Sequence, residues 1–419
     1  MGNMMTALHP PLRGTLSPLR GARGVWWFLV VILVASSAFA DRRHAVRNTG
    51  VPAAYADLYD LLSAQLDAAQ AQVAPLRPEL RPQPIYAADL LPANANRGTD
   101  LLRPQAMDGV RAFLDRFQQL GIRGVVMTLG YPLLLDRFPN SAQYLQFYKQ
   151  VVAEVRGRGM TVEIESSVLF ANSAFSSISW DYSRTPFSQF VQERHDMISK
   201  IVTELAPDYL ELGAEPDTEA KLTGYAQLNV PSVWAQSIGQ IIAGIDRGST
   251  KLGTGIGTWD PISFVDAEVQ LGIDFIGLHI YPMDSSSMVT AFQAASMARA
   301  HGKPIVIDEA WLYKMRPGES TSIAGNATIF GRDAFDFFMP LDQRFLRFLD
   351  DFARAEGVTL ISPFWSTYLF GYLPYSQATA ALSYDQIVAQ VNAIAATNIV
   401  KGFATPTGAY YGMLIGGRR

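Results

Sequence analysis

YLELGAEPDT at residues 209–218 and PIVIDEAWL at residues 304–312 are short apolar runs that each contain a late glutamate. Glu215 and Glu309 stand where β-type residues give way to a loop. A carboxylate at the carboxyl end of a buried parallel strand is unfavourable for folding, but it is well placed for chemistry at the mouth of a barrel. Two such stretches in one chain predict an enzyme that works with a pair of carboxylates.

Outward from these two stretches, short β-branched runs alternate with amphipathic helical patterns. Eight candidate strands begin near Ile85, Gly124, Thr161, Tyr209, Lys251, Phe275, Pro304 and Thr359. This alternation favours parallel strands joined by crossovers, and eight units favour a closed ring over an open sheet. The sequence therefore predicts an α/β fold, a (β/α)8 TIM barrel that forms a single catalytic domain over residues 84–419.

Apolar residues at helical spacing predict the helices around the barrel and one helix ahead of it. Leu58, Leu61, Leu62 and Leu66, and later Val73, form one apolar stripe within residues 41–83. This segment is expected to be a linker and an N-terminal helical extension that docks on the barrel. A last amphipathic stretch at residues 384–394 is expected to close the ring.

The first forty residues have the order of a secretory signal peptide. Arginines precede an apolar run at residues 25–34, and the small-x-small sequence that ends at Ala40 follows it. This order predicts a secreted or periplasmic protein, cleaved after Ala40, with no stable membrane contact. The alternative is an uncleaved membrane anchor, because the apolar run up to Ala40 approaches the length that spans a bilayer.

Composition excludes several kinds of site and partner. The 419 residues include no cysteine, and the formal net charge is -4. Disulfides, thiolate ligands and thiol nucleophiles are thereby excluded, and the mild acidity argues against a nucleic-acid partner. None of the five histidines is spaced as a metal-binding pair, so no metal and no other cofactor is expected. They are His9, His44, His195, His279 and His301.

The two glutamates are expected on the inner side of their strands. A period of two places Glu211 and Glu215 together if the strand stays regular, and the same count groups Ile305, Ile307 and Glu309. Both terminal glutamates are then expected at a common mouth. Such a pair can hydrolyse a glycosidic bond, because one carboxyl can protonate the leaving oxygen while the other attacks the anomeric carbon. Retention requires the carboxyls to lie about 5 to 5.5 Å apart.

Over nearly the whole expected barrel, these strand ends resemble the retaining glycoside hydrolases of clan A. The resemblance implies that Glu215, which precedes a proline on strand four, is the acid/base and that Glu309 on strand seven is the nucleophile. His279 and Tyr281 in FIGLHIYP match the clan's His-x-Tyr, which implies a Tyr281 hydroxyl donated to the nucleophile and a lowered pKa of Glu309. Trp365 in PFWSTY resembles the tryptophan floor beneath the sugar.

Two positions depart from the pattern of the clan. Ala214 stands where an asparagine usually precedes the acid/base and contacts the 2-hydroxyl of the sugar. Strand two, GVVMTLGY, lacks the arginine that many relatives carry beside the nucleophile. FIGLHIYP has some likeness to strand six of endo-β-1,4-galactanases, and the acid/base region has some likeness to β-mannanases; neither likeness selects a sugar.

Further residues near strand ends are candidates for substrate binding. Glu165 faces the barrel axis late in strand three, where it could bind sugar hydroxyls or belong to a hydrogen-bonded barrel interior. Asp89 and Trp259 have the same two interpretations. Aromatic residues in the long loop at residues 169–186 could stack on sugar rings or pack the loops down; they are Phe170, Phe175, Trp180 and Tyr182. Trp311 and Trp365 are expected to bind the substrate.

The resulting prediction is an exported, cofactor-free, retaining O-glycosyl hydrolase of a β-linked polysaccharide or oligosaccharide. The alternative is a non-catalytic carbohydrate-binding barrel of an envelope or exopolysaccharide system. A carboxyl separation of about 5 Å between Glu215 and Glu309 supports hydrolysis, and one beyond roughly 10 Å counts against it. A metal-dependent hydrolase or an aldolase would need a His/Asp cluster or a Schiff-base lysine, and apart from His279 the expected strand ends offer neither.

Overall fold

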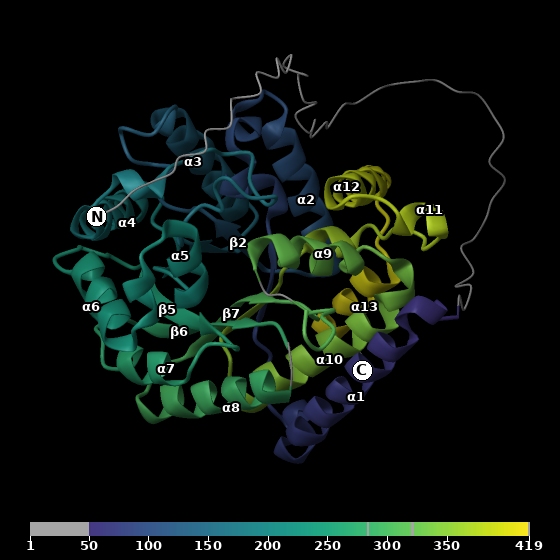
Figure 1. The fold of residues 1–419 in the computed structure, drawn as a ribbon. Coiled ribbons are helices and arrows are strands. Elements are labelled where there is room, and N and C mark those ends of the chain that lie inside the picture. Colours follow the sequence, from purple (N-terminus) through teal and green to yellow (C-terminus); the bar gives the residue numbers. More distant parts are fainter. Residues whose placement is uncertain (1–49, 283–284, 320–321, 418–419) are drawn as a thin grey trace, which may run out of the picture.

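Eight parallel strands form a closed barrel in the computed structural model, which describes residues 50–282, 285–319 and 322–417 (Figure 1). The strands are β1 (Ile85–Asp89), β2 (Gly124–Thr128), β3 (Thr161–Glu165), β4 (Tyr209–Glu211), β5 (Lys251–Gly257), β6 (Phe275–Ile280), β7 (Ile305–Ala310) and β8 (Leu360–Pro363). Each strand pairs with the next, and β8 pairs with β1. The predicted (β/α)8 barrel is confirmed, and the predicted signal segment lies outside the described residues.

A layer of apolar side chains fills the part of the barrel nearest the amino-terminal ends of the strands. It consists of Ala87, Val126, Tyr209, Phe275, Val306 and Leu360. Gly253 makes room for this layer, because a Cβ there would lie only 2.2 Å from the ring of Phe275. The floor of the barrel is therefore tightly packed, and the polar side chains lie farther along the strands.

The strand β7 departs from a regular pairing near its carboxyl end. Its register against β6 shifts between Gly277 and His279, and its register against β8 shifts between Ile307 and Ala310. Val306 belongs to the apolar floor and Ile307 to the outer core, so the expectation that Ile307 faces the barrel axis is wrong. The irregularity lets the consecutive residues Asp308 and Glu309 both contact His279.

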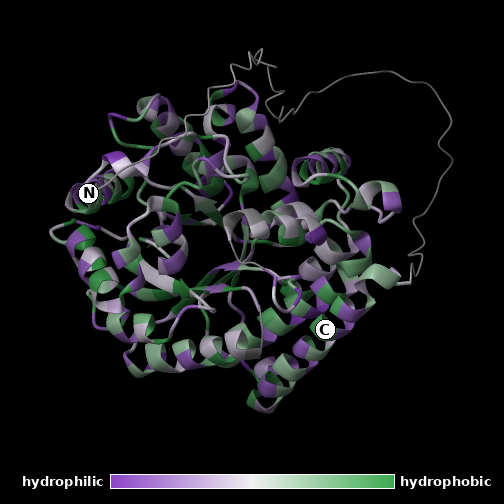
Figure 2. Ribbon diagram, in the orientation of Figure 1, coloured by the Kyte–Doolittle hydropathy of each residue, from purple (hydrophilic) through white to green (hydrophobic). Residues whose placement is uncertain are grey.

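Helices surround the barrel and carry hydrophilic as well as hydrophobic residues (Figure 2). They are α2 (Ala106–Leu120), α3 (Ser141–Gly157), α4 (Phe187–Glu204), α5 (Pro216–Thr223), α6 (Pro231–Ile242), α7 (Ser263–Glu268), α8 (Ser285–Ala300), α9 (Ile323–Asp333), α10 (Met339–Glu356), α11 (Gln377–Ala380), α12 (Tyr384–Lys401) and α13 (Pro406–Ile415). In α2, Val110, Phe113 and Phe117 are buried along one face, as their spacing predicts. Gly121 ends that helix with a φ of 83°, which favours glycine.

The helix α13, and not the expected stretch at residues 384–394, closes the ring. It packs against both α10 and α2, and the hydroxyl of Tyr411 donates to the carbonyl of Ala87 on β1 at 2.9 Å. The helix α12 contains the expected stretch and packs against α9 and α2. The expectation for residues 384–394 is therefore wrong. The sequence did not indicate α13 because this helix is less amphipathic than α12, although its Tyr411 and Leu414 are fully buried.

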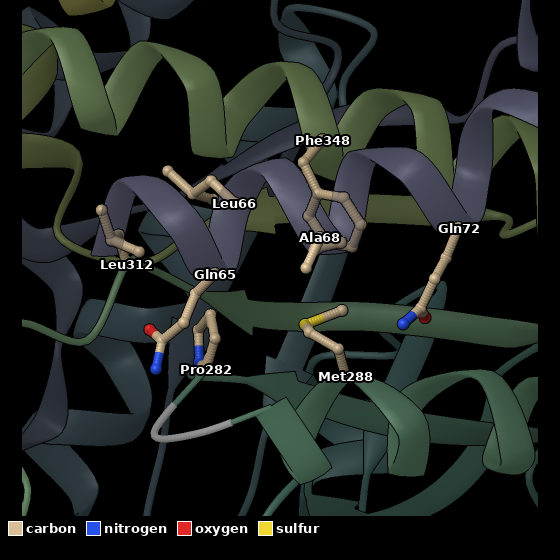
Figure 3. Close-up of a pocket in the computed structure, with 9 residues that line it drawn as sticks. Gln65, Leu66, Ala68, Gln72, Pro282, Met288, Leu312 and Phe348 are labelled. Atoms are coloured by element: carbon tan, nitrogen blue, oxygen red, sulfur yellow. The ribbon is translucent and has the colours of Figure 1, made fainter. Parts of the chain in front are cut away.

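The predicted N-terminal extension is the helix α1 (Ala56–Val73), which lies along α10 (Figure 1). Four residues of the predicted stripe are buried, namely Leu58, Leu62, Leu66 and Val73, whereas Leu61 is only partly buried. A small cavity of about 40 Å³ remains beside α1, and Figure 3 shows Leu66, Pro282 and Met288 around it. The extension is therefore part of the packed domain.

Among the described residues, no single helix has both the length and the hydropathy that a membrane span needs. The helices α12 and α13 meet the criterion only when taken together, and they are bent by 54° at the break between them.

Candidate active site

Glu215 reaches the barrel mouth through a sharp turn after β4. The strand ends at Glu211, so the regular alternation expected up to Glu215 does not continue. Glu215 has a φ of 54° and a ψ of 68°, and Pro216 begins α5 directly after it. Trp365 after β8 is also left-handed, with a φ of 54°. Such a conformation costs a residue other than glycine about 1 to 3 kcal/mol and is typical of functional sites.

The structure brings Glu215, Glu309 and His279 together. One ligand atom from each of the three lies within 4.8 Å of the other two. Nδ1 of His279 is 2.8 Å from Oε1 of Glu215 and 3.5 Å from Oε2 of Glu309. The carboxyl side chains are 15% and 12% exposed, so a ligand at the mouth can touch both.

Tyr281 holds the second carboxyl group in place. Its buried hydroxyl donates to Oε2 of Glu309 at 2.9 Å. This hydrogen bond lowers the pKa of Glu309, as expected, but burial outweighs it and raises the pKa well above the ordinary value. The expectation of a lowered pKa for Glu309 is therefore corrected. Two carboxyl groups held side by side in this way can provide a general acid or base and a nucleophile.

Buried acidic side chains surround the other ring nitrogen of His279. Nε2 lies 3.5 Å from Oε2 of Glu211 and 3.5 Å from Oδ1 of Asp308. Burial lowers the pKa of His279, but the charges of Glu309 and Asp308 outweigh it and raise that pKa well above its ordinary value. Burial also raises the pKa of Glu211 well above its usual range, and the charge of Asp308 adds to the effect. Asp308 was not among the residues predicted for the site.

Glu165 belongs to a hydrogen-bonded barrel interior and is only 4% exposed. Its Oε2 accepts from the hydroxyl of Thr128 at 3.2 Å, and its Oε1 accepts from that of Ser167 at 3.1 Å. Burial raises the pKa of Glu165 to about 7. Asp89 is also buried, at 1% exposed. The structure therefore supports the hydrogen-bonded interior for Glu165, whereas Oδ2 of the buried Asp89 has no hydrogen-bond partner among the described residues.

Aromatic rings that are half-buried line the mouth beside the carboxyl groups. Trp259 lies with its ring centroid 6.0 Å from that of Tyr281, and its Nε1 donates to Oδ1 of Asp217 at 3.1 Å. The ring of Trp365 lies 5.2 Å from that of Phe330. Phe330 is on α9, within the connection after β7, and no strand-end pattern in the sequence indicated it.

Trp311 does not share this exposure. It is 1% exposed, and its ring stacks on Tyr368 at a centroid distance of 5.6 Å. Nζ of the buried Lys314 lies 5.7 Å from the ring centroid. Trp311 is therefore a core residue in this structure, and the expectation that it offers a ring to a substrate is corrected.

The described residues contain two groups whose geometry could hold a metal ion. One is Glu215, His279 and Glu309 at the mouth; the other is Glu165, Glu211 and His279 beneath it. In each group the ligand atoms lie within 4.8 Å of one another. The expectation of no metal was based on spacing along the sequence, and folding creates both groups from residues that are far apart in the chain.

No protein-family model and no curated protein matches the sequence. Among solved structures, the chain is similar to an exo-β-1,4-mannosidase from Opitutaceae bacterium strain TAV5, with a TM-score of 0.50 and 15% identity over 77% of this chain. The chain spans 60% of the length of that protein. A β-glucosidase from Thermotoga maritima has a TM-score of 0.46 and 11% identity, covering 81% of this chain and 99% of its own. The mannosidase likeness shows a shared barrel fold.

Proposed function

We propose that this chain is a retaining O-glycosyl hydrolase that acts on a β-linked polysaccharide or oligosaccharide. The observation that carries the proposal is the proximity of the two carboxyl groups, with one oxygen of Glu215 and one of Glu309 within 4.8 Å of each other. Retaining enzymes need their carboxyls about 5 to 5.5 Å apart, whereas inverting enzymes need about 6.5 to 9.5 Å to admit a water. The short separation between the two carboxyl groups supports the retaining geometry.

In the proposed reaction, Glu309 attacks the anomeric carbon while Glu215 donates its proton to the leaving oxygen. The glycosidic bond breaks and a glycosyl ester forms on Glu309. Glu215 then takes a proton from water, the water oxygen attacks the anomeric carbon, and Glu309 leaves as a carboxylate. Tyr281 and His279 support these roles, because each is within 3 Å of one of the two carboxyl groups.

The surroundings of the pair also support a carbohydrate ligand. Trp259, Trp365 and Phe330 are half-buried rings near the carboxyls, and flat aromatic faces suit the apolar CH faces of sugars. The barrel fold is shared with a protein named as an exo-β-1,4-mannosidase. We further propose that the chain is exported, on the basis of its first forty residues.

The test is a screen of the purified protein on β-linked polysaccharides and aryl glycosides, beside Glu309→Ala. Turnover is expected in the wild type and is expected to fall by about 10⁴-fold or more in the variant, because the nucleophile is gone. Glu79→Ala, which removes an exposed glutamate ahead of the barrel, is the matched control and should keep full activity. A proton NMR spectrum of the first product formed should show the β-anomer.

The alternative, a non-catalytic carbohydrate-binding barrel, has a distinct outcome in the same screen. Saturable binding of one glycan without turnover would support it and would contradict the hydrolase. Ala214, which is 2% exposed and lacks the amide of the usual asparagine, would then be the first residue to change.

A further inference from the structure

Beneath the mouth, four carboxyl side chains and one imidazole share the barrel interior. The carboxyls are Glu163, Glu165, Glu211 and Asp308, which we call the inner acid layer, and the imidazole is that of His279. None of these five residues is more than 4% exposed. Glu211, His279 and Asp308 lie farther along their strands than the residues of the apolar floor, and Glu165 lies two residues beyond Glu163, which pairs in register with the floor residues Val126 and Tyr209.

Most polar atoms of this group have no partner among the described residues. Both oxygens of Glu163, Glu211 and Asp308 are buried without a hydrogen bond, and so is Nε2 of His279. No described lysine or arginine forms an ion pair with these three carboxyls; the contacts of Glu211 and Asp308 are with His279. Each unsatisfied buried polar group costs about 1 to 3 kcal/mol, and a charged one costs more. So many together indicate that a ligand satisfies them.

The distances between these atoms suit the ligands of one metal ion. Nε2 of His279 is 3.5 Å from Oε2 of Glu211 and 3.5 Å from Oδ1 of Asp308. A carboxylate oxygen of Glu165 lies within 4.8 Å of the ligand atoms of Glu211 and His279. An ion with bonds of about 2.0 to 2.2 Å to nitrogen and oxygen keeps neighbouring ligand atoms roughly 3 to 3.6 Å apart.

The hydrogen bond on the opposite side of the imidazole favours coordination by Nε2. Nδ1 of His279 lies 2.8 Å from Oε1 of Glu215, so a proton on Nδ1 can be donated to that carboxylate. A histidine that binds a metal almost always donates its other N–H to a carboxylate, a carbonyl or a water. The lone pair of Nε2 is then directed at Glu211 and Asp308.

Glycine at position 277 makes room for this arrangement. A Cβ on Gly277 would lie only 1.8 Å from Oε1 of Glu211. Any other residue would therefore displace the carboxylate that faces His279. The backbone of β6 thus provides both the imidazole and the space for one of its acidic neighbours.

We propose that the barrel interior binds one divalent transition-metal ion, of the Zn²⁺ or Mn²⁺ class, through Nε2 of His279 and the carboxylates of Glu211 and Asp308. Glu165 lies within reach as a fourth ligand. Imidazole suits zinc, and carboxylates suit manganese. The ion joins β4, β6 and β7 and holds the imidazole against Glu215. This inference rests on the interior residues and does not depend on the proposed hydrolysis.

The test measures metal content directly. The full chain is incubated with Zn²⁺ or Mn²⁺, passed over a desalting column and measured by inductively coupled plasma mass spectrometry. About one ion per chain is expected in the wild type, with a higher melting temperature than after chelator treatment. Glu211→Gln and Asp308→Asn should each reduce the bound metal at least tenfold. Glu268→Gln changes a buried carboxyl outside the inner acid layer and should retain the ion.

Two outcomes would overturn the proposal. One is a wild type that binds neither ion, which would mean that protons neutralise the inner acid layer. The other is a metal content that is unchanged in both Glu211→Gln and Asp308→Asn, which would place the ion elsewhere.

A measurement on folded protein covers the case in which those variants do not fold. Zn²⁺ added to wild type with ¹⁵N-labelled histidine should shift the Nε2 signal of one imidazole. That shift should persist when each histidine other than His279 is replaced in turn by Gln. The absence of any imidazole shift would also overturn the proposal.

Discussion

Nδ1 of His279 lies 2.8 Å from Oε1 of Glu215, within hydrogen-bond distance of that carboxyl group. The same nitrogen is 3.5 Å from Oε2 of Glu309. The imidazole of His279 on β6 thus lies between the carboxyl group of Glu215, which follows β4, and that of Glu309, which is on β7. Since each of these groups affects the charge of the others, substitutions at the mouth should change the pH dependence as well as the rate.

Glu215→Ala should slow substrates with poor leaving groups far more than those with good ones. The reason is that a good leaving group departs without the proton that Glu215 supplies in the proposed reaction. Azide should restore turnover of the activated substrates and yield a glycosyl azide, since it needs no general base. The comparison is kcat/KM for a series of aryl glycosides with and without azide. An equal loss across the series would contradict the acid/base role.

Tyr281→Phe should lower kcat/KM by about 10- to 100-fold, because a hydrogen bond to a charged group contributes about 1.5 to 3 kcal/mol. The lost hydrogen bond lowers the pKa of Glu309, so its removal should raise that pKa and move the acid limb of the pH–rate profile to higher pH.

Tyr313→Phe is the matched control for this change. Tyr313 packs with its ring 6.1 Å from that of Tyr281, but its hydroxyl donates to Asn326 and not to a carboxyl. The control should leave the acid limb in place. If both variants shifted it equally, the hydrogen bond to Glu309 would not be the cause.

Trp365→Ala should raise KM several-fold with a smaller effect on kcat, because its half-buried ring offers a stacking face at the mouth. Phe403→Ala, at a ring that is 60% exposed between α12 and α13, is the control and should leave both constants unchanged. Initial rates over a range of substrate concentration separate the two constants. An unaltered KM in Trp365→Ala would remove this ring from the substrate site.

Glu268→Gln should make the stability of the protein less dependent on pH. Burial raises the pKa of Glu268 to about 8 from an ordinary value of 4.5, so the folded state holds a proton that the unfolded state releases. The resulting stabilisation is fully present below about pH 4.5 and is lost as the pH rises toward 8, with a slope of up to about 1.4 kcal/mol per pH unit.

The glutamine variant has no such proton to lose, and it keeps an oxygen for the Nε1 of Trp234, which donates to Oε1 of Glu268 at 2.7 Å. Urea unfolding at pH 5 and pH 8 measures the effect. Wild type should lose more stability between these two values than the variant does. Equal losses in both proteins would show that Glu268 does not titrate in this range.

The strands and the two mouth glutamates were predictable because their signals are local. Short β-branched runs mark each strand, and Pro216 directly after Glu215 marks the start of the helix α5. The orientation of β7 was not predictable in the same way. A period of two assumes a regular strand, and the register shifts between Ile307 and Ala310 turn Asp308 as well as Glu309 toward His279.

The ring of Phe330 and the burial of Trp311 show the same limit of local patterns. Both aromatic residues follow β7 in the chain, yet the ring of Phe330 packs against Tyr281 at the mouth, and Trp311 stacks on Tyr368 in the core. Their difference depends on how α9 folds over the barrel and on contacts with residues after β8. The sequence around Phe330 or Trp311 therefore does not predict these contacts.

The eight-stranded barrel and the position of Glu215 and Glu309 near the ends of two strands follow from hydrophobic pattern and turn chemistry over about ten residues of sequence. Which polar groups meet inside the barrel depends on the tertiary structure. Glu211, His279 and Asp308 come from three different strands, and their approach depends on strand register and on the space beside Gly277. Contacts across a closed barrel are long-range, so local periodicity does not determine them.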